Sequence, residues 1–541
     1  MPQCADRRSK SKFIIGFRAV LVLFVVVSTS TLMAAIDPVV RIESGLVRGS
    51  GTDVVAFKGI PFAAPPVGPF RWKAPQPATP WEGTRDAVEF CPSCPQPVIF
   101  AGAVSKQSED CLGLNIWTPA KSAGDKLPVM VWIYGGGFTI GSSSQPTYDG
   151  EALARQGVIV VSFNYRLGAL GFLAHPDLSR ETPEGVSGNY GLLDQIAALK
   201  WVQRNIRNFG GDPGQVTIFG ESAGGASVMT LLVSPLAKGL FHRAIAQSGT
   251  YAFTPIRHLR ESWYGYKSAE AAGAEMGDLK TLREMSVQDL LKKALSSGHP
   301  FFDFGRGIHR PIVDGWLLPD EPSTLYEQGR INQVPLIAGV NADEATLLLM
   351  QLRTARTVAA YRTWLAESFG EEAAGRIIKM YPAAVDSDVN EAIQHLVTDF
   401  MFVEPTISVL RAVESKAPVY LYRFTRVGAG GKATKLGAFH SSEIVYVFGS
   451  YKSPILPFPG ADKFDETDFA LGRAMMASWL QFAKTGDPNG PGLLKWPRYS
   501  VRDQQCLEFG DAPSPAQVPG VDAIDLLCSE FKGLKAARVT R

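Results

Sequence analysis

The sequence predicts an α/β fold with a mostly parallel central sheet, helices on both faces and helical insertions. Short apolar runs rich in β-branched residues alternate with segments of helical periodicity, as in a doubly wound sheet. Most of these runs lack the alternation of a half-exposed strand, so we expect them to be buried on both faces, as parallel strands are. The chain has 541 residues, 45% of them hydrophobic, which is enough for a large core.

The first 35 residues differ from the rest of the chain. Five basic residues precede a nine-residue apolar run, 19–27, and the segment after it is rich in small residues and ends in Ala34 and Ala35. This order is typical of a secretory signal peptide, with an uncleaved membrane anchor as the alternative. Nine apolar residues are few for a membrane span. We therefore expect a signal peptide at 1–35, a single catalytic domain at 36–541, and a secreted or periplasmic protein without a stable membrane span.

The strands are predicted in the order of the chain. Six apolar runs are expected to form them, at residues 129–134, 158–163, 216–219, 243–246, 336–340 and 419–424. Between the second and third runs, apolar residues recur at helical spacing from Leu192 to Ile206. Two longer stretches, 252–310 and 343–415, are expected to be mostly helical, as insertions would be.

Charge and glycine-rich motifs exclude several classes of function. The net charge is +2, and no Lys/Arg-rich stripe or aromatic ladder occurs, so we expect no nucleic-acid partner. The glycines at 135–137 do not form a dinucleotide-binding loop, because Ile140 stands where G-x-G-x-x-G requires its last glycine. The phosphate-binding motif G-x-x-x-x-G-K-[ST] is also absent from the sequence. We therefore predict no cofactor.

The cysteines fit an exported protein better than a metal site. Cys4 lies in the leader, and the others are Cys91, Cys94, Cys111, Cys506 and Cys528. Export makes disulfides expected. The C-x-x-C at 91–94 has no second pair and no nearby histidine, so we predict no metal. Because five is an odd number, one thiol is expected to stay free.

The segment GESAGGAS, residues 220–227, carries the candidate nucleophile. A lone G-x-S-x-G can arise by chance in a glycine-rich chain, so its surroundings must decide. Ser222 lies between the predicted strand 216–219 and a small-then-apolar helical pattern at 223–232. This context is typical of a nucleophile elbow, the sharp turn that exposes a catalytic serine in α/β-hydrolases.

A serine nucleophile needs an acid and a base, which follow it in that order in α/β-hydrolases. Asp343 and Glu344, just after the fifth predicted strand, are both candidate acids. Only two of the seven histidines come later. His395 lies in a helix-like stretch and is expected to be structural, whereas His440 lies in a loop that suits a base. We predict His440 as the base and leave the acid open.

The oxyanion that forms during acyl transfer needs preorganised N–H donors. A second glycine-rich turn, YGGGF at 134–138, follows the first predicted strand. The N–H groups of Gly136 and Gly137, together with that of Ala223 beside the serine, are the candidate donors of a three-membered oxyanion hole.

Five longer motifs resemble the signatures of the type-B carboxylesterase/lipase family. They are FKGIPFAAPP at 57–66, EDCLGLN at 109–115, WIYGGGF at 132–138, NYRLGALGF at 164–172 and FGGDPGQVTIFGESAGG at 209–225. The resemblance covers about residues 40 to 530, and its motifs are highly specific. It implies an α/β-hydrolase fold for residues 36–541 and a serine carboxylesterase that acts on a small-molecule ester.

The resemblance also assigns roles to residues. It implies that Ser222 is the nucleophile, His440 the base and Glu344 the acid, and that Gly136, Gly137 and Ala223 form the oxyanion hole. Glu221 is similar to a family residue that tunes the site from outside the triad. The family's first disulfide implies a bridge between Cys94, in the C-x-Q motif, and Cys111. Cys506 and Cys528 match no family pairing and could pair with each other.

Three other kinds of family member serve as alternatives. Some relatives lack the serine and act as binding proteins, but this chain keeps all three triad residues. Cholinesterases hold a cation with a tryptophan in the loop before the EDCL cysteine, and residues 95–110 contain none. In fungal lipases the same loop is a long lid, whereas this loop is short. We therefore favour an esterase of soluble substrates over an inactive secreted binding protein or an interfacial lipase.

The segment before the PIVDG motif at 311–315 contributes to the acyl pocket in this family. Here the candidate substrate-binding residues are Phe304, Arg306 and Arg310. An arginine that points inward would bind a carboxylate on the acyl group. The substrate would then be a half-ester of a polycarboxylic acid, as for bacterial members that remove tricarballylate from fumonisin mycotoxins in a detoxification reaction. The alternative is that these side chains face solvent.

Overall fold

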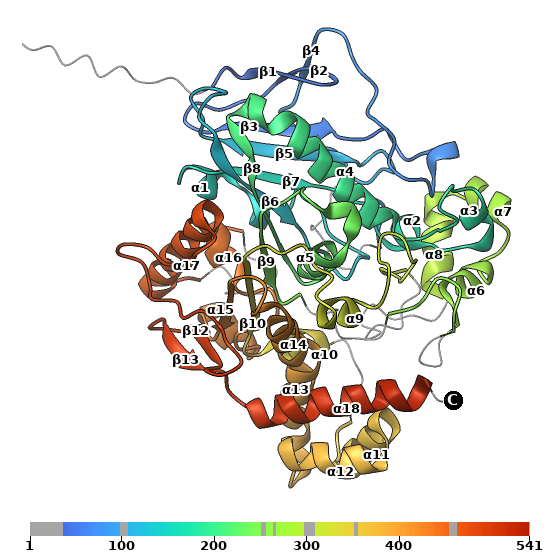
Figure 1. Ribbon diagram of the computed structural model, residues 1–541, viewed down its shortest axis with the longest axis vertical. Helices are drawn as coiled ribbons and strands as arrows, with labels where there is room; N and C mark the ends of the chain where they lie inside the picture. The colour runs from blue at the N-terminus through green and yellow to red at the C-terminus, as the bar shows by residue number, and fades with distance from the viewer. Residues whose placement is uncertain are drawn as a thin grey trace, which may run out of the picture. The chain divides into compact units, whose positions relative to one another are not determined.

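A large mixed sheet forms the centre of the fold (Figure 1). The computed structural model describes residues 36–97, 106–249, 256–262, 267–296, 309–350, 355–453 and 463–539. Within them, ten strands pair in the order β13-β12-β11-β10-β9-β8-β6-β7-β5-β3. Their bounds are β3 Val55–Pro61, β5 Gly113–Thr118, β6 Leu127–Ile133, β7 Ile159–Phe163, β8 Gly211–Glu221, β9 Arg243–Gln247, β10 Leu336–Asn341, β11 Val419–Phe424, β12 Gln505–Phe509 and β13 Ser514–Gln517.

The centre of this sheet is parallel, as predicted. In the order of the sheet, the seven neighbouring strands β12, β11, β10, β9, β8, β6 and β7 are all parallel to one another. At one end β13 pairs antiparallel with β12, and at the other end β5 pairs antiparallel with β7 and β3 with β5. All six predicted strands are present, and β7 and β10 are buried at every position. Burial on both faces explains why their sequences are continuous apolar runs.

Helices cover both faces of the sheet, which confirms the predicted α/β-hydrolase architecture. On one side lie α1 Glu151–Ala154, α16 Ile444–Phe448 and α17 Glu466–Thr485, and on the other lie α4 Tyr190–Asn205 and α5 Ala223–Val233 (Figure 1). The buried residues of α4 include Leu192, Ile196, Leu199 and Val202, the periodic apolar positions of the sequence. Helix α5 is buried along its whole length. These layers enclose the main core.

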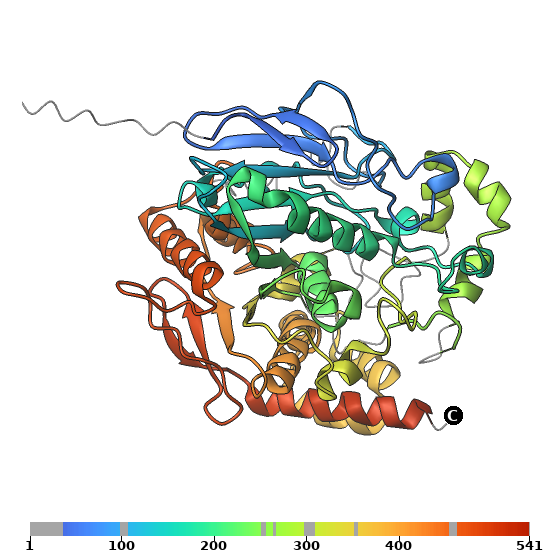
Figure 2. The ribbon, with the colours of Figure 1, turned by 45° about the horizontal axis from the view of Figure 1, so that its top comes forward.

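The remaining elements lie around these layers. A small sheet of β1 Val39–Ile42, β2 Gly45–Arg48 and β4 Thr84–Asp86 lies beyond β3, and α18 Val521–Val539 runs along the opposite side of the fold (Figure 2). The first inserted region contains α6 Ala269–Ala274, α7 Leu279–Glu284 and α8 Val287–Ser296. The second contains α10 Glu344–Leu349, α11 Val358–Phe369, α12 Glu371–Met380, α13 Val389–Thr398 and α14 Glu404–Val413. The other helices are α2 Gly168–Phe172, α3 Pro176–Arg180, α9 Pro322–Glu327 and α15 Ala429–Thr434.

The second inserted region has a core of its own. Tyr361, Leu365, Ile377 and Leu396 pack together there, and Leu527 of α18 joins them. This cluster explains why the insertion is helical, since each helix has an apolar face to bury. No helix among the described residues has both the length and the apolar content needed to cross a membrane.

Candidate active site

Ser222 forms the turn between β8 and α5. Its backbone has φ 55° and ψ −123°, a conformation that a residue with a side chain adopts only under strain. The N–H of Ser222 donates to the carbonyl of Gln247 at 2.9 Å. A Cβ on Gly224 would lie 1.9 Å from the carbonyl oxygen of Ile133, so only glycine allows α5 to begin this close to β6. The turn leaves Ser222 half-buried.

His440 and Glu344 form a direct pair. Nδ1 of His440 lies 2.6 Å from Oε2 of Glu344, which is fully buried at the start of α10. The other oxygen of this carboxylate accepts hydrogen bonds from the N–H of Asn341 at 2.7 Å and from the hydroxyl of Ser248 at 2.5 Å. The carboxylate therefore fixes the ring through Nδ1 and leaves Nε2 as the atom that can take a proton.

Asp343, the other candidate acid, has a different role in the structure. One of its carboxylate oxygens accepts a hydrogen bond from the N–H of Ala438 at 2.7 Å, and its own N–H donates to the carbonyl of Ala438 at 3.0 Å. These bonds tie the end of β10 to the segment that leads into His440. Asp343 thus holds the histidine loop, while Glu344 contacts the ring.

Glu221 lies on the other side of the imidazole ring. Its Oε1 is 3.3 Å from Nε2 of His440 and accepts a hydrogen bond of 2.5 Å from the hydroxyl of Ser441. Burial raises the pKa of Glu221 to about 8, although His440 and Ser441 act in the opposite direction. Burial alone lowers the pKa of His440, but the carboxylates of Glu221 and Glu344 outweigh it and raise the pKa to about 9.

Glu443 is a third buried carboxylate that the sequence analysis missed. It accepts hydrogen bonds from Asn341 at 2.6 Å and Gln247 at 3.0 Å, and Trp479 donates to the same glutamine at 3.1 Å. Burial raises the pKa of Glu443, and the nearby Glu344 adds to this effect. The only signal in the sequence is its position three residues after His440.

The hydroxyl of Ser222 and the ring of His440 are not in direct hydrogen-bond contact. Within the described residues, no hydrogen bond joins them. A Cβ on Gly135 would lie 2.9 Å from the Cβ of Ser222 and 2.8 Å from Oε2 of Glu221, so the serine and this carboxylate border the same space. Nε2 of His440 faces the carboxylate. Catalytic hydrogen bonds are often long in unliganded enzymes and tighten when substrate binds.

The glycine-rich turn after β6 contains two of the three residues that were predicted to donate to an oxyanion. Gly136 has φ 107° and Gly137 has φ 62°, values that favour glycine. The third donor, Ala223, is the first residue of α5, where N–H groups have no partner within the helix. Among the described residues, none of these three N–H groups donates a hydrogen bond to another protein atom. All three are therefore available to an anion.

The structure contains a disulfide between Cys94 and Cys111, with an S–S distance of 2.07 Å. This is the pairing that the family resemblance implies. Part of the loop that it closes, residues 98–105, lies outside the described residues. The bridge thus anchors both ends of the loop before the EDCL motif.

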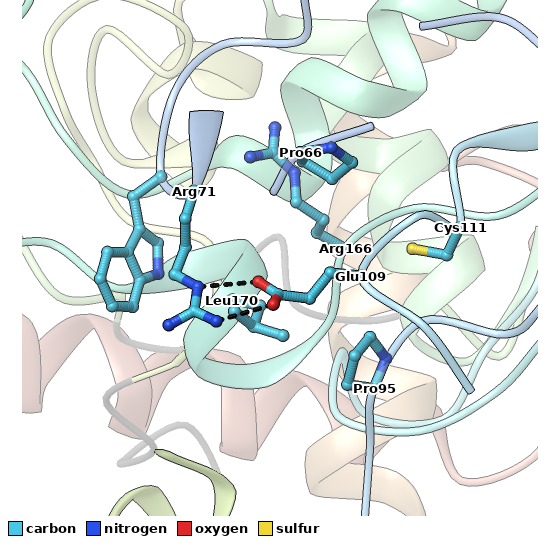
Figure 3. A pocket seen from close by; sticks show the side chains of 8 residues that line it. Pro66, Arg71, Pro95, Glu109, Cys111, Arg166 and Leu170 are labelled. Carbon is cyan, nitrogen blue, oxygen red and sulfur yellow. Dashed lines mark hydrogen bonds and ion pairs between the residues drawn. The ribbon is translucent and has the colours of Figure 1, made fainter. Parts of the chain in front are cut away.

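A small pocket borders this disulfide (Figure 3). It is lined by Pro66, Arg71, Trp72, Pro95, Glu109, Cys111, Arg166 and Leu170. Arg71 donates two hydrogen bonds to Glu109, at 2.8 and 2.7 Å, and also donates to the carbonyl of Met285 just after α7 at 2.9 Å. The glutamate of the EDCL motif therefore serves to fasten this loop to the first helical insertion.

The expectations for the other cysteines are wrong in two respects. Cys506 and Cys528 do not pair, because Cys506 is buried on β12 with a free thiol, while the sulfur of Cys528 on α18 lies 3.8 Å from the hydroxyl of Ser408. Cys91 is also a free thiol, so more than one free thiol is present. Burial raises the pKa of Cys91 to about 11, which disfavours its thiolate form at neutral pH.

The remaining predicted residues are placed only in part. Phe304 and Arg306 lie outside the described residues, and Arg310 is half-buried just before the PIVDG motif. The side chain of His395 is exposed on α13, in agreement with a role outside the site. Within the described part of the chain, no group of three or more His, Cys, Asp or Glu residues is arranged to hold a metal ion.

Comparisons with known proteins agree with this geometry. The model of the "Carboxylesterase family" matches residues 36–521. A fumonisin B1 esterase from Sphingopyxis macrogoltabida is 42% identical over 88% of this chain and 87% of its own length. A para-nitrobenzyl esterase from Bacillus subtilis is 37% identical over 87% of this chain and 94% of its own. The solved structure of a thermophilic PNB esterase superposes with a TM-score of 0.79 at 34% identity, covering 91% of this chain and all of the other.

Proposed function

Because this chain belongs to the carboxylesterase family and is a serine-type carboxylic ester hydrolase, we propose that Ser222, His440 and Glu344 are its catalytic triad. The observation that carries this assignment is the strained backbone of Ser222 at the junction of β8 and α5. Such strain persists only where the surrounding structure enforces it, and it aims the hydroxyl out of the core. The pairing of His440 with buried Glu344 supports the other two roles.

In the first half of the proposed reaction, Nε2 of His440 takes the proton of the Ser222 hydroxyl as Oγ attacks the ester carbonyl. The tetrahedral oxyanion accepts hydrogen bonds from the N–H groups of Gly136, Gly137 and Ala223. When this intermediate collapses, the C–O bond to the alcohol breaks, and His440 returns the proton to the departing alcohol. An acyl ester of Ser222 remains.

In the second half, water replaces the alcohol. His440 removes a proton from the water, whose oxygen attacks the acyl carbonyl. The bond between the acyl carbon and Oγ of Ser222 then breaks, His440 returns the proton to Oγ, and the carboxylic acid leaves. Glu344 stabilises the imidazolium in both halves. We assign Glu221 a tuning role, since its carboxylate lies 3.3 Å from Nε2 and favours the protonated ring.

The triad proposal is tested by active-site titration with a p-nitrophenyl ester. Wild type should release nitrophenol in a burst of one equivalent per chain, and Ser222→Ala should show no burst and lose roughly 10⁴-fold or more in kcat. Ser227→Ala is a matched control, because Ser227 lies buried in the same helix and bonds to Gln195 and Ala223. A full burst from Ser222→Ala would overturn the assignment.

We also propose that the acyl group of the natural ester carries a free carboxylate. The proposal is supported by the 42% identical relative, which is named for fumonisin B1, and by the basic residues before the PIVDG motif. A charge-assisted contact between an arginine and a carboxylate is worth about 1.5–3 kcal/mol, which corresponds to a preference of about 10- to 150-fold. Toxins of the fumonisin type are then among the candidate substrates, and their hydrolysis would be a detoxification.

The acyl proposal is tested by comparing kcat/KM for a tricarballylate half-ester and for a matched butyrate ester. Wild type should prefer the charged ester, and Arg306→Ala or Arg310→Ala should reduce that ratio. Arg330→Ala is the control, since this arginine is exposed after α9. If wild type prefers the butyrate ester, or if neither variant changes the ratio of the two kcat/KM values, the proposal of a charged acyl group is wrong. The enzyme is then an esterase without that preference.

We further propose that residues 1–35 are a signal peptide and that the mature enzyme is secreted or periplasmic. The support is the order of basic, apolar and small residues in the leader. Expression of the full chain in a bacterial host followed by intact-mass analysis of the exported fraction tests this. A mature chain that begins near Ile36 is expected, and an uncleaved chain in the membrane fraction would contradict it.

A further inference from the structure

A π-helical turn, Asp399–Val403, lies between α13 and α14. Pro405 follows it as the second residue of α14 and has no N–H to donate to the carbonyl of Met401, four residues earlier. The loss of this bond explains why the helix widens at this point. Each residue of an α-helix turns the side-chain direction by about 100°, so an extra residue re-aims the side chains of the turn.

The turn directs Phe402 at His440. The centroids of the two rings are 5.1 Å apart, and the ring planes are inclined by 52°. Phe402 is 5% exposed and packs in a small cluster with Val340 of β10 and Leu348 of α10. Its ring therefore fills the space beside the imidazole and leaves little room for the histidine to change rotamer.

The turn is fastened to the helix that carries the acid. The N–H of Ala345, next to Glu344, donates to the hydroxyl of Thr398 at 3.1 Å. The hydroxyl of Tyr381 donates to Asp399, the first residue of the turn, at 2.8 Å. Because Leu348 lies one helical turn after Glu344, α10 holds the carboxylate on one side of His440 and supports the phenyl ring on another.

We propose that Phe402 is a positioning residue of the catalytic histidine: its ring holds the imidazole plane in the orientation set by Glu344 and stabilises the imidazolium that forms during acyl transfer. The inference rests on the proposed triad. An aromatic ring within about 6 Å attracts a cation through its quadrupole, and a tilted aromatic contact adds to simple burial. Phe402 thereby acts on the reaction through His440.

The other groups that face His440 are carboxylates. They come from Glu221 at the end of β8, Glu344 at the start of α10 and Glu443 just before α16. All three favour the protonated ring. Phe402 carries no charge, so its replacement leaves this set intact. A fall in the pKa of His440 then reports the lost contact between the rings, since reduced burial would raise this pKa.

The experiment compares Phe402→Leu with Phe402→Tyr and with the control Phe400→Leu. Phe400 lies two residues earlier in the turn, and its ring packs edge-on against Phe369 of α11, with centroids 5.3 Å apart. The rate of fluorophosphonate inactivation is measured against pH, together with kcat and KM for a p-nitrophenyl ester. These rates depend on the triad, and inactivation does not require a fitted acyl pocket.

For Phe402→Leu we expect kcat and the inactivation rate to fall about 3- to 10-fold with KM nearly unchanged. The acid limb of the pH profile should move to lower pH by a few tenths of a unit, because the imidazolium loses a stabilising neighbour. Phe402→Tyr should retain most of the wild-type rate. Phe400→Leu should leave the acid limb of the pH profile at its wild-type position. If Phe402→Leu fails to fold, Phe402→Met replaces it.

Three outcomes would overturn the positioning role. They are an unshifted acid limb with an unchanged rate in Phe402→Leu, an increase in KM alone, and an equal loss in Phe400→Leu. Failure of the triad proposal would look different, since Ser222→Ala would then keep its burst. A full burst of one equivalent in Phe402→Leu shows that the nucleophile is intact and that the slower rate arises at the histidine.

Discussion

At the scale of single residues, the proposed mechanism makes the activity depend on the charge of His440. The ring must be neutral to take a proton from Ser222. An ordinary imidazole is neutral above a pH of about 6.5, and the sequence alone predicts a rise in activity near that value. In the structure, burial lowers the pKa of His440, but the neighbouring carboxylates reverse this and raise the pKa to about 9. We therefore expect the activity to rise at alkaline pH.

The first prediction concerns Glu221. In wild type, kcat/KM should increase with pH on the alkaline side of neutrality. Glu221→Gln removes the carboxylate 3.3 Å from Nε2 and should move the midpoint of this increase down by about 1–3 pH units. Glu372→Gln, an exposed carboxylate on α12, should leave the midpoint where it is. A midpoint that does not move in Glu221→Gln would show that this carboxylate does not set the charge of His440.

The second prediction separates the two acids. Glu344→Gln should lower kcat by up to about 10⁴-fold, because the amide no longer stabilises the imidazolium. Asp343→Asn should lower it by less than about 10-fold, since within the described part of the chain this side chain bonds to the backbone before His440 and not to its ring. Circular dichroism of both variants controls for folding. A larger loss in Asp343→Asn than in Glu344→Gln would assign the acid to Asp343.

At the scale of the element, the strands and the elbow were predictable from the sequence. The strands β6 to β11 are buried on both faces over most of their length, so the buried parts of their sequences are apolar runs. The G-x-S-x-G serine lies where one such run meets a helix. The two outermost strands at each end of the sheet, β3 and β5 at one end and β13 and β12 at the other, were missed because each contains a polar residue or a proline and none is a continuous apolar run. The π-helical turn was also missed, since Pro405 alone does not indicate how the helix widens.

The third prediction concerns the glycine-rich turn after β6. In Gly136→Ala the new Cβ would lie 2.1 Å from the carbonyl oxygen of Ile140, at φ 107°. The turn must therefore move, and the misplaced oxyanion donors should lower kcat by about 100- to 1000-fold. Gly375→Ala is the matched control, because a Cβ there meets no atom within 4 Å on α12. Wild-type kcat in Gly136→Ala would exclude the turn from the oxyanion hole.

At the scale of the whole molecule, the parallel sheet brings the site together. Ser222, Glu344 and His440 follow β8, β10 and β11, and the glycine-rich turn follows β6. Since these strands are parallel, their carboxyl ends meet at one edge of the sheet, where α/β proteins bind ligands. The order of the strands thus predicts that these groups meet. The contacts of Glu443 and Phe402 were not predictable, because they join side chains far apart in the sequence.

The fourth prediction concerns the stability of the whole chain. The Cys94–Cys111 bridge closes a loop with a sequence separation of 17, and its removal in Cys94→Ser/Cys111→Ser should destabilise the fold by about 2–4 kcal/mol. The thermal midpoint should fall by a few degrees, as followed by circular dichroism. Cys528→Ser, which leaves the bridge in place, should have a smaller effect. Equal midpoints for the double variant and wild type would show that the bridge does not stabilise the fold.

The central claim is that Ser222 is the nucleophile that His440 activates. The most direct measurement is to label the enzyme with a fluorophosphonate and to map the adduct by mass spectrometry of its peptides. We expect one adduct per chain, on the peptide that contains Ser222, and none in Ser222→Ala. In His440→Ala the labelling should be slowed by several orders of magnitude. An adduct on another serine, or undiminished labelling of Ser222→Ala, would contradict the account.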